Sequence, residues 1–263
     1  MSAEGIDVMP TDTFWTHFYE IYEALPRQGP GDRESTERAA RLLPPLTADR
    51  RILDIGCGSG AQTLDLAQVT EAYIVAVDNH PPFVSQLARR ADEAGMGGRI
   101  TAQVGDMNDL PFSDGSFDVV WSEGSIFIMG FAKGLAEWRR LLVPGGHMVV
   151  SEFCWLCDNP PAEMEELFLD GPSDVGNVEA RQRAVVDNGY RLLADFVLPE
   201  VGWWENYYVP LGKCLEHFRR SHGDNPDALD VASRSQREID VYRKYAGTFG
   251  YVFFIMQRDD RGA

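Results

Sequence analysis

The sequence predicts an α/β fold in which a largely parallel sheet is covered by helices on both faces. Short apolar runs alternate with segments of helical periodicity from residue 51 to residue 153. Apolar strands separated by helices form βαβ units, and the strands of such a sheet are buried on both faces. A chain of 263 residues, 44% of them hydrophobic, is long and apolar enough for one such domain with an appendage.

Each predicted strand is a short apolar run, and these runs cover residues 51–55, 73–78, 99–104, 117–121, 147–153, 190–198 and 251–257. Helical periodicity predicts helices over residues 11–25, 35–43, 60–69, 82–94, 131–142, 161–169 and 178–188. Pro144, Gly145 and Gly146 are expected to end the helix before the fifth strand. We expect a helical N-terminal cap (1–45) and a main domain (46–263), with a helical, aromatic substrate-cap insertion over 199–249.

The charge balance disfavours several kinds of partner. Lys and Arg number 24 and Asp and Glu number 41, giving a net charge of −17. Nucleic acids are held through phosphate contacts that need a basic surface, and anionic membrane surfaces also attract basic segments. The sequence has neither the roughly 20-residue apolar run of a membrane helix nor a signal-peptide pattern in residues 1–10. We therefore expect a cytoplasmic protein that binds neither nucleic acid nor membrane.

Two cysteines in a C-x-x-C spacing, Cys154 and Cys157, follow the fifth predicted strand. A thioredoxin-type motif does not fit this position, and a zinc site needs further ligands that no second cysteine pair supplies. Binding of a soft acceptor, a thiol or a metalloid, is a further alternative. Buried structural cysteines are the favoured interpretation, and no metal is expected.

A glycine-rich turn between the first strand and the next helix carries the main functional signal. Gly56, Gly58 and Gly60 stand at alternate positions, where glycine allows a tight turn and a close approach of a ligand to the backbone. The same residues also satisfy a dinucleotide fingerprint. Asp78, at the end of the second strand, is the ribose-binding acid expected for either kind of cofactor.

The motifs that follow separate these two interpretations. In chain order they are Leu53–Gly60, Val77–Asp78, Gly105–Phe112, Phe117–Trp121 and Leu142–Gly146. Together they resemble the class I, Rossmann-like methyltransferases that use S-adenosyl-L-methionine, in particular the small-molecule subgroup similar to ubiquinone and menaquinone methyltransferases. The resemblance covers roughly residues 50 to 153. It implies a seven-stranded, mostly parallel sheet whose last strand is antiparallel, and methyl transfer by in-line displacement that leaves S-adenosyl-L-homocysteine.

The resemblance also implies cofactor-binding residues, which are Gln28, Asp54, Gly56, Gly58, Gly60, Asp78, Asn79, Asp106, Met107 and Ser122. The glycines would lie against the methionine part of the cofactor, and Asp78 would accept hydrogen bonds from both ribose hydroxyls. Asp106 would accept from the adenine amino group. Asp54 would support the loop or reach the cofactor amine. The alternative for these carboxylates is that they only form turns or cap helices.

Residues that act on the acceptor are harder to predict. Glu123, after the fourth strand, is the candidate base, with cofactor binding or helix capping as the alternative. The N-terminal helix and the insertion are the candidate substrate lid, and its proposed substrate-binding residues are Tyr22, Trp203, Tyr207 and Tyr208. These rings suit stacking and cation–π contacts. The alternative is that they attach the insertion to the core. His17 is interpreted as a packing or surface residue.

The predicted function is methyl transfer from S-adenosyl-L-methionine to a small-molecule acceptor. The negative net charge weakly disfavours strongly anionic acceptors. An NAD-dependent oxidoreductase on a related sheet, and a non-catalytic regulator that binds S-adenosyl-L-methionine, are the alternatives. The sequence leaves open the acceptor, the methylated atom (O, N, C or S) and the oligomeric state.

Overall fold

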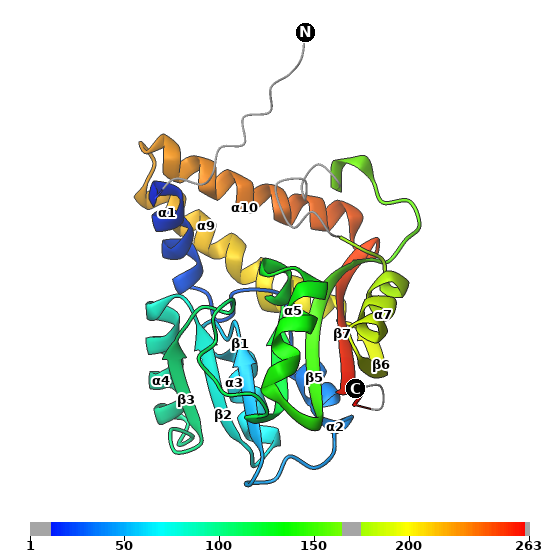
Figure 1. Ribbon diagram of the computed structural model, residues 1–263. Helices are drawn as coiled ribbons and strands as arrows, with labels where there is room; N and C mark the ends of the chain where they lie inside the picture. The colour runs from blue at the N-terminus through cyan, green and yellow to red at the C-terminus, as the bar shows by residue number, and fades with distance from the viewer. Residues whose placement is uncertain (1–11, 165–174, 261–263) are drawn as a thin grey trace.

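The computed structural model describes residues 12–164 and 175–260. Seven strands form one sheet in the order β3-β2-β1-β4-β5-β7-β6 (Figure 1). The strands are β1 (Arg51–Ile55), β2 (Tyr73–Asp78), β3 (Ile100–Val104), β4 (Phe117–Glu123), β5 (Leu142–Trp155), β6 (Tyr190–Val197) and β7 (Phe249–Arg258). The first five strands pair in parallel, and β7 lies antiparallel between β5 and β6. The predicted seven-stranded sheet with an antiparallel last strand is confirmed.

The helices that surround the sheet are α1 (Asp12–Glu23), α2 (Arg33–Arg41), α3 (Ala61–Val69), α4 (Pro81–Glu93), α5 (Phe131–Trp138), α7 (Val178–Asp187), α8 (Glu200–Trp203), α9 (Val209–Ser221) and α10 (Pro226–Tyr245). Two short 3₁₀ turns, η1 (Ile126–Ile128) and η2 (Arg139–Leu141), flank α5, and a π-helical turn, η3 (Trp204–Tyr208), precedes α9. The predicted helix over 161–169 falls partly on residues 165–174, which lie outside the described residues.

Helices cover both faces of the sheet because successive strand residues point to opposite sides. On β4, Val119 and Trp121 join the core beneath α2, α3 and α4, whereas Val120 joins the core beneath α5 and α7. All three side chains are at most 1% exposed. This alternation of two apolar sides explains why the strands were recognisable as continuous apolar runs.

The region around Pro144 differs from the sequence prediction. The helix predicted to end at Leu142 ends at Trp138 and continues as a 3₁₀ turn, and β5 begins at Leu142 rather than at His147. Leu142 pairs with Phe117 and His147 pairs with Val119, so the register shifts between these two pairs. The proline and glycines therefore form an irregularity within a long strand, which a local turn signal does not distinguish from a loop.

The strand order reverses direction between β1 and β4, which lie side by side although β2 follows β1 in the chain. In open α/β sheets, this reversal opens a crevice at the carboxyl ends of the strands. Helices α1, α9 and α10 lie together at one end of the molecule (Figure 1). The α1 helix contacts both α9 and α10.

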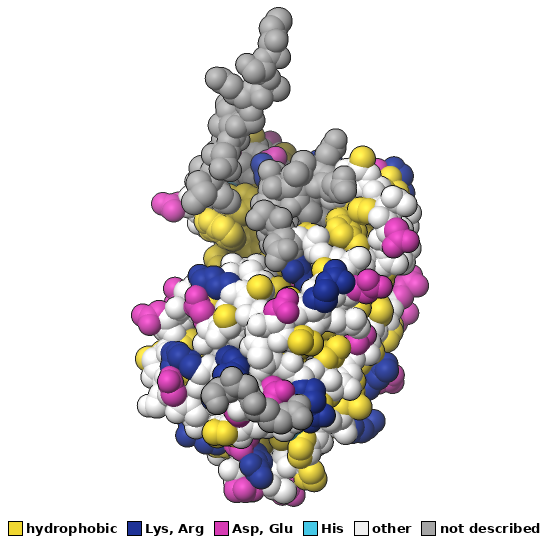
Figure 2. All heavy atoms as spheres, turned by 45° about the vertical axis from the view of Figure 1, so that its right-hand side comes forward, with side chains coloured by type: hydrophobic (Ala, Val, Ile, Leu, Met, Phe, Trp, Pro, Cys, Tyr) yellow, Lys and Arg dark blue, Asp and Glu magenta, His cyan; other side chains and the backbone are white. Residues whose placement is uncertain are grey.

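The surface is mixed in charge on the face that Figure 2 shows, where acidic and basic side chains are interspersed. None of the described helices is long and apolar enough to span a bilayer.

Candidate functional site

A cavity of about 260 Å³ lies where β1, β2, β3 and β4 end. Of the predicted site residues, seven line it: Gln28, Gly56, Gly58, Asp78, Asn79, Met107 and Glu123. The other predicted residues do not line this cavity: Asp54, Gly60, Asp106, Ser122, Tyr22, Trp203, Tyr207 and Tyr208. The structure therefore gathers residues from five separate segments at the predicted edge of the sheet.

The glycine turn after β1 forms the floor of the cavity. Gly56 and Gly58 have φ angles of 72° and 53°, which are accessible to glycine at little cost. A Cβ on Gly56 would lie 2.3 Å from the Ser125 Oγ, and one on Gly58 would lie 2.6 Å from the Gln28 Oε1. Both positions thus favour glycine for the backbone angle, and Gly56 also requires it for the space. Gly60 does not line the cavity; it is the N-cap of α3 and packs against Leu87.

Asp78 lies at the end of β2 and is largely buried beside this turn. Its carboxylate accepts hydrogen bonds from the backbone N–H groups of Gly58 and His80, each at 2.9 Å. Burial raises the pKa of Asp78, and these donors oppose that shift. A carboxylate has about four acceptor positions. Acceptor positions that these donors leave free can accept from a ligand in the cavity.

Asp54 lies below the floor and not in the cavity wall. Its side chain is fully buried, and it accepts a hydrogen bond of 2.5 Å from the Thr63 hydroxyl. Burial raises the pKa of Asp54 to about 7, against the effect of the Thr63 hydrogen bond. Of the two roles considered from the sequence, the geometry favours support of the loop through α3.

After the end of β3, the predicted residue Met107 lines the cavity, whereas Asp106, which was also predicted, does not. Asp106 is exposed, and its carboxylate accepts hydrogen bonds from the backbone and the side-chain amide of Asn108. These hydrogen bonds lower the pKa of Asp106. Met107 and Asn108 line the cavity, and the Met107 carbonyl accepts from the Trp138 Nε1 at 3.1 Å. The backbone of this segment is therefore held in place by α5.

Glu123, the predicted base, is buried at the edge of the cavity and is already bound to three donors. It accepts from the Arg27 Nη2 at 2.7 Å, the Thr36 hydroxyl at 2.8 Å and the Trp121 Nε1 at 3.0 Å. Burial raises the pKa of Glu123, and the Arg27 charge opposes that shift. The geometry favours a role in holding the loop after α1, and the role of base stays a prediction.

That loop, residues 27–31, closes one side of the cavity. Gln28 connects it to the floor, because its Oε1 accepts from the Ser59 backbone N–H at 2.8 Å. The Gln28 Nε2 donates to the carbonyl groups of Tyr22 and Leu25, each at 3.2 Å. Gln28 thus fixes the loop both to the floor, through Ser59, and to the C-terminal end of α1.

Aromatic residues of the cap pack against one another rather than along this cavity. Tyr22, Trp203, Tyr207 and Tyr208 are each at most 6% exposed. The hydroxyls of Tyr22 and Tyr207 lie 3.1 Å apart, and Trp203 stacks on Tyr242 with 5.1 Å between ring centroids. The geometry favours the alternative that these rings attach the insertion to the core.

Ser122 is also buried outside the cavity, where its hydroxyl lies 2.7 Å from that of Ser125. Ser125 lines the cavity and donates to the Ile55 carbonyl, which joins β4 to the floor.

The apolar walls of the cavity were not predicted, and they include Phe18, Phe83, Phe127 and Ile128. Phe18 lies on the aromatic α1 helix, whose periodicity did not indicate which ring faces a ligand. Phe127 and Ile128 lie in η1, and Ile128 is 63% exposed. An apolar run shortly after the fourth predicted strand, residues 126–128, is the sequence signal that could have identified this wall.

The cysteine pair is separate from the cavity. Cys154 is fully buried, and burial raises its pKa to about 12, so the thiol is protonated. Cys157 is half-buried, and its thiol donates to the Thr248 carbonyl at 3.4 Å. A packing role for both cysteines is favoured by these contacts.

Comparison with known proteins agrees with this arrangement. Residues 52–146, which include β1 to β4 and the cavity floor, match a family model described as a methyltransferase domain. Over these residues the chain is similar to methyltransferases. The motifs that carry the resemblance lie within the residues that the family model matches.

Two curated methyltransferases share part of their sequence with this chain. The 27-O-demethylrifamycin SV methyltransferase of Amycolatopsis mediterranei is 33% identical over 119 residues, which cover 45% of this chain and 43% of that protein. A ubiquinone/menaquinone biosynthesis C-methyltransferase of a Geobacter species is 36% identical over 106 residues, 39% of this chain and 45% of that protein. The chain thus spans less than half the length of these two relatives.

A solved structure is similar over nearly the whole chain. It is described as a SAM-dependent methyltransferase from Geobacter sulfurreducens in complex with S-adenosyl-L-homocysteine. The TM-score is 0.78, with 23% sequence identity and coverage of 92% of this chain and 97% of that one. At this identity the likeness shows the fold, including the helices outside residues 52–146.

Proposed function

We propose that this protein transfers the methyl group of S-adenosyl-L-methionine to a small-molecule acceptor. One observation carries the proposal: the glycine floor, the Asp78 carboxylate and the Met107 segment line one cavity at the point where the strand order reverses. The methyltransferase relatives and the neighbour with bound S-adenosyl-L-homocysteine support the same cofactor.

The cavity residues suit the parts of this cofactor. The Asp78 carboxylate keeps acceptor capacity for the ribose hydroxyls. Gly56 and Gly58 line the cavity without a side chain, so the methionine part can approach their backbone closely. Met107 and Phe83 supply apolar contacts for a flat ring. When bound, the sulfonium of the cofactor supplies the methyl group.

The residues of the chain would then contribute mainly alignment. In-line displacement from a good leaving group depends on the approach of the two reactants, and a preformed site supplies that approach. Loop 27–31 is fixed to the floor by Gln28 and to β4 by the pair of Arg27 with Glu123. A closed loop also excludes water from the reacting atoms. We propose that Glu123 is a positioning residue, which acts through Arg27.

The apolar wall supports an acceptor with a hydrophobic or aromatic surface. Phe18, Phe127 and Ile128 line the cavity beside the floor. The relatives are named for methylation at oxygen and at carbon, so reaction class does not restrict the methylated atom. The net charge of −17 weakly disfavours strongly anionic acceptors. The cytoplasmic location, the exclusion of nucleic acid and the division at residue 45 stay predictions.

Binding of the cofactor is the first test. We would titrate the purified protein calorimetrically with S-adenosyl-L-methionine, S-adenosyl-L-homocysteine and NAD. The proposal expects heat from both adenosyl ligands and none from NAD. Binding of NAD alone would identify the oxidoreductase alternative and overturn the proposal.

Asp78→Asn tests the carboxylate in the same titration. Loss of hydrogen bonds to a charged group, each worth about 1.5–3 kcal/mol, should weaken adenosyl binding at least tenfold. Asp118→Asn is the matched control, because Asp118 binds Arg50 at the opposite end of the sheet. Equal affinities of the two variants would remove Asp78 from the site.

Methyl transfer is tested separately with S-adenosyl-L-methionine labelled in the methyl group. Candidate acceptors would be phenols, amines, quinols and prenyl compounds, with label extracted into the product. Binding without transfer to any acceptor, together with a cavity filled by side chains, would favour the regulatory alternative.

A further inference from the structure

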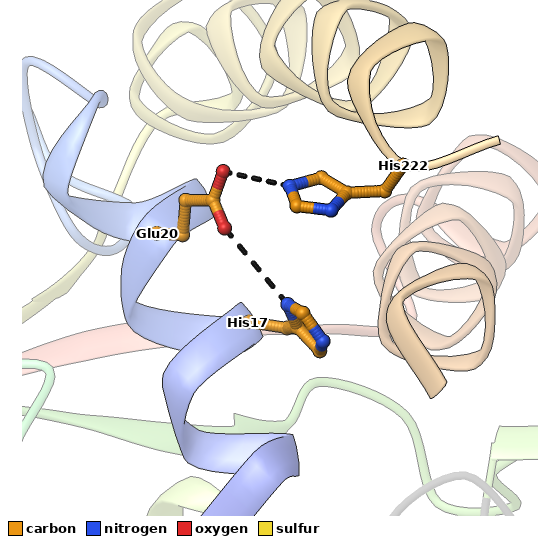
Figure 3. Close-up of side chains that lie close together, drawn as sticks. All are labelled: His17, Glu20 and His222. Carbon is orange, nitrogen blue, oxygen red and sulfur yellow. Dashed lines mark hydrogen bonds and ion pairs between the residues drawn. The ribbon is translucent and has the colours of Figure 1, made fainter. Parts of the chain in front are cut away.

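Three potential metal ligands meet at the end of the molecule where α1 packs against α9 (Figure 3). His17 and Glu20 are three residues apart on α1 and so share a helix face, and His222 directly follows α9. The ligand atoms of all three side chains lie within 4.8 Å of one another. The Glu20 carboxylate lies between the two rings, 2.8 Å from the His222 Nε2 and 3.8 Å from the His17 Nδ1.

The His17 ring supplies a second, independent observation. The residue is only 8% exposed, and its Nδ1 is buried without a hydrogen-bond partner among the described residues. That atom points toward the Glu20 carboxylate, as Figure 3 shows, but 3.8 Å is too long for a hydrogen bond. A buried polar atom without a partner costs free energy, and a ligand in the gap would remove that cost.

We propose that His17, Glu20 and His222 bind a divalent transition-metal ion of the zinc type and so join α1 to the end of α9. Two imidazole nitrogens and one carboxylate form a ligand set suited to zinc, with water in the fourth position. Zinc–ligand distances of about 2.0–2.1 Å in tetrahedral geometry place ligand atoms roughly 3.3 Å apart. The Nδ1 to carboxylate gap therefore needs only a small contraction. The site is independent of the proposed methyl transfer.

Asn225 favours one tautomer of the neutral His17 ring and thereby tunes the site. Its Oδ1 caps α10 by accepting from the backbone of Asp227 and Ala228, so its Nδ2 faces the His17 Nε2 at 3.4 Å. This contact favours the tautomer that carries its proton on Nδ1. Coordination through Nδ1 requires the proton to move to Nε2, which then faces an amide donor. Asn225 therefore weakens metal binding, and a carboxylate at this position would strengthen it.

The site has a structural consequence for the cavity. Phe18, adjacent to His17 on α1, lines the cavity, whereas His17 and Glu20 lie on another face of the same helix. A bound ion would fix this wall of the cavity to α9 and the start of α10. Sequence reasoning missed the site because a single i, i+3 histidine–glutamate pair on one helix does not indicate a ligand that follows another helix.

The test uses the full chain without an affinity tag, titrated calorimetrically with Zn²⁺ and, in parallel, with Co²⁺ observed by visible absorption. The wild-type protein should bind one Zn²⁺, show a higher melting temperature with it, and give a Co²⁺ spectrum without the intense thiolate band. His222→Gln and Glu20→Gln change partly exposed side chains and should each weaken binding by at least tenfold. His217→Gln, an exposed position on α9, should bind as the wild type does.

Asn225→Asp distinguishes coordination by His17 from adventitious binding at the surface. Aspartate still caps α10 and also accepts from the Nε2–H of a metal-bound His17, so affinity should rise about tenfold. Unchanged Zn²⁺ affinity in His222→Gln, or unchanged or weaker affinity in Asn225→Asp, would overturn the proposal. A Co²⁺–thiolate spectrum would assign binding to a cysteine and would overturn it as well.

Discussion

Two regions around the cavity use polar groups in opposite ways. In the loops at the strand ends, Asp78 and Asp106 bind neighbouring backbone N–H groups, and Asp78 keeps acceptor positions toward the cavity. In the aromatic cluster of the cap, formed by Tyr22, Trp203, Tyr207, Tyr208 and Tyr242, the polar tips that form hydrogen bonds point inward. The first region is arranged for a ligand, and the second is arranged to hold elements together.

The electrostatics of the aromatic cluster fit this difference. The Tyr22 hydroxyl pairs with that of Tyr207, and the Tyr208 hydroxyl donates to Glu238 at 3.0 Å. Burial raises the pKa of Tyr207 and of Tyr208 well above the ordinary value. These phenols stay neutral in the physiological range and act as hydrogen-bonding core residues.

The ion pair that joins loop 27–31 to the end of β4 should show the largest effect on stability. Glu123→Gln removes the partner of Arg27, whose side chain is 10% exposed, and leaves its charge buried. Loss of one member of a buried ion pair should lower the free energy of unfolding by about 3 kcal/mol. Chemical denaturation measures this loss, and adenosyl-ligand affinity should fall as loop 27–31 is released.

A double variant distinguishes the cost of an unpaired buried charge from the loss of the contact that fixes the loop. Arg27→Met combined with Glu123→Gln removes both charges at similar volume, so much of the stability should return while the loop is no longer fixed. If Glu123→Gln keeps full stability and wild-type ligand affinity, the ion pair does not hold loop 27–31 to β4.

An alanine on the floor of the cavity should destabilise the protein more than an alanine at another glycine with a positive φ angle. Gly56→Ala meets the Ser125 Oγ at 2.3 Å, whereas Gly95→Ala has a nearly equal φ of 70° and no atom within 4 Å. Both variants therefore carry the same backbone cost of about 1–2 kcal/mol, and only Gly56→Ala also collides with a neighbouring side chain. We expect Gly56→Ala to be the less stable by at least about 1 kcal/mol and to lose adenosyl binding, as measured by denaturation and calorimetry.

Equal losses of stability in the two alanine variants, with ligand binding retained in both, would mean that the floor has room to adjust. Its close packing would then be no part of the difference between the two regions.

The same contrast explains what the sequence could predict. The bounds of β1 and β2 and the glycine turn after β1 agree with the predictions, because each depends on local residues and on backbone angles available to glycine. The seven-stranded, mostly parallel sheet with an antiparallel last strand follows from the family resemblance and from βαβ connectivity. Positions at the ends of adjacent parallel strands must converge, so Asp78 and Met107 could be placed beside the floor.

The aromatic cluster could not be placed in this way. Tyr22 and Tyr207 are 185 residues apart, and Arg27 and Glu123 are 96 apart. A tyrosine has both an apolar ring and a polar tip, so it suits a ligand pocket and a core equally well. Which one it joins depends on how α1, α9 and α10 pack. Likewise, the double glycine before His147 reads as a turn until its pairing with β4 is known.

Asp54 beneath the floor should make stability depend on pH. Burial raises its folded-state pKa to about 7, above the value of about 3.9 in an unfolded chain. The folded protein therefore binds this proton more tightly, and the resulting stabilisation is full below the unfolded pKa and is lost as pH rises toward 7. From pH 5 to pH 8, the stability of the wild type relative to Asp54→Asn should fall by about 2 kcal/mol.

Urea denaturation of both proteins across this pH range measures the difference, and effects of other groups cancel in it. Parallel curves would mean that Asp54 titrates as an exposed carboxylate does, so that the floor is not sealed from solvent.

The smallest effect is expected in the aromatic cluster, and it tests the cluster's role most directly. Tyr22→Phe removes a hydroxyl that lies 3.1 Å from that of Tyr207 and leaves the latter buried with one partner fewer. The free energy of unfolding should fall by about 1 kcal/mol, while KM and kcat with a methyl acceptor stay as in the wild type. Tyr19→Phe, on the same helix, is the control, since its hydroxyl has no hydrogen bond among the described residues and its removal should leave stability unchanged. If Tyr22→Phe instead raises KM for the acceptor and leaves stability intact, the hydroxyl contacts the acceptor, and the division between a ligand-binding floor and a cohesive cap is wrong at this residue.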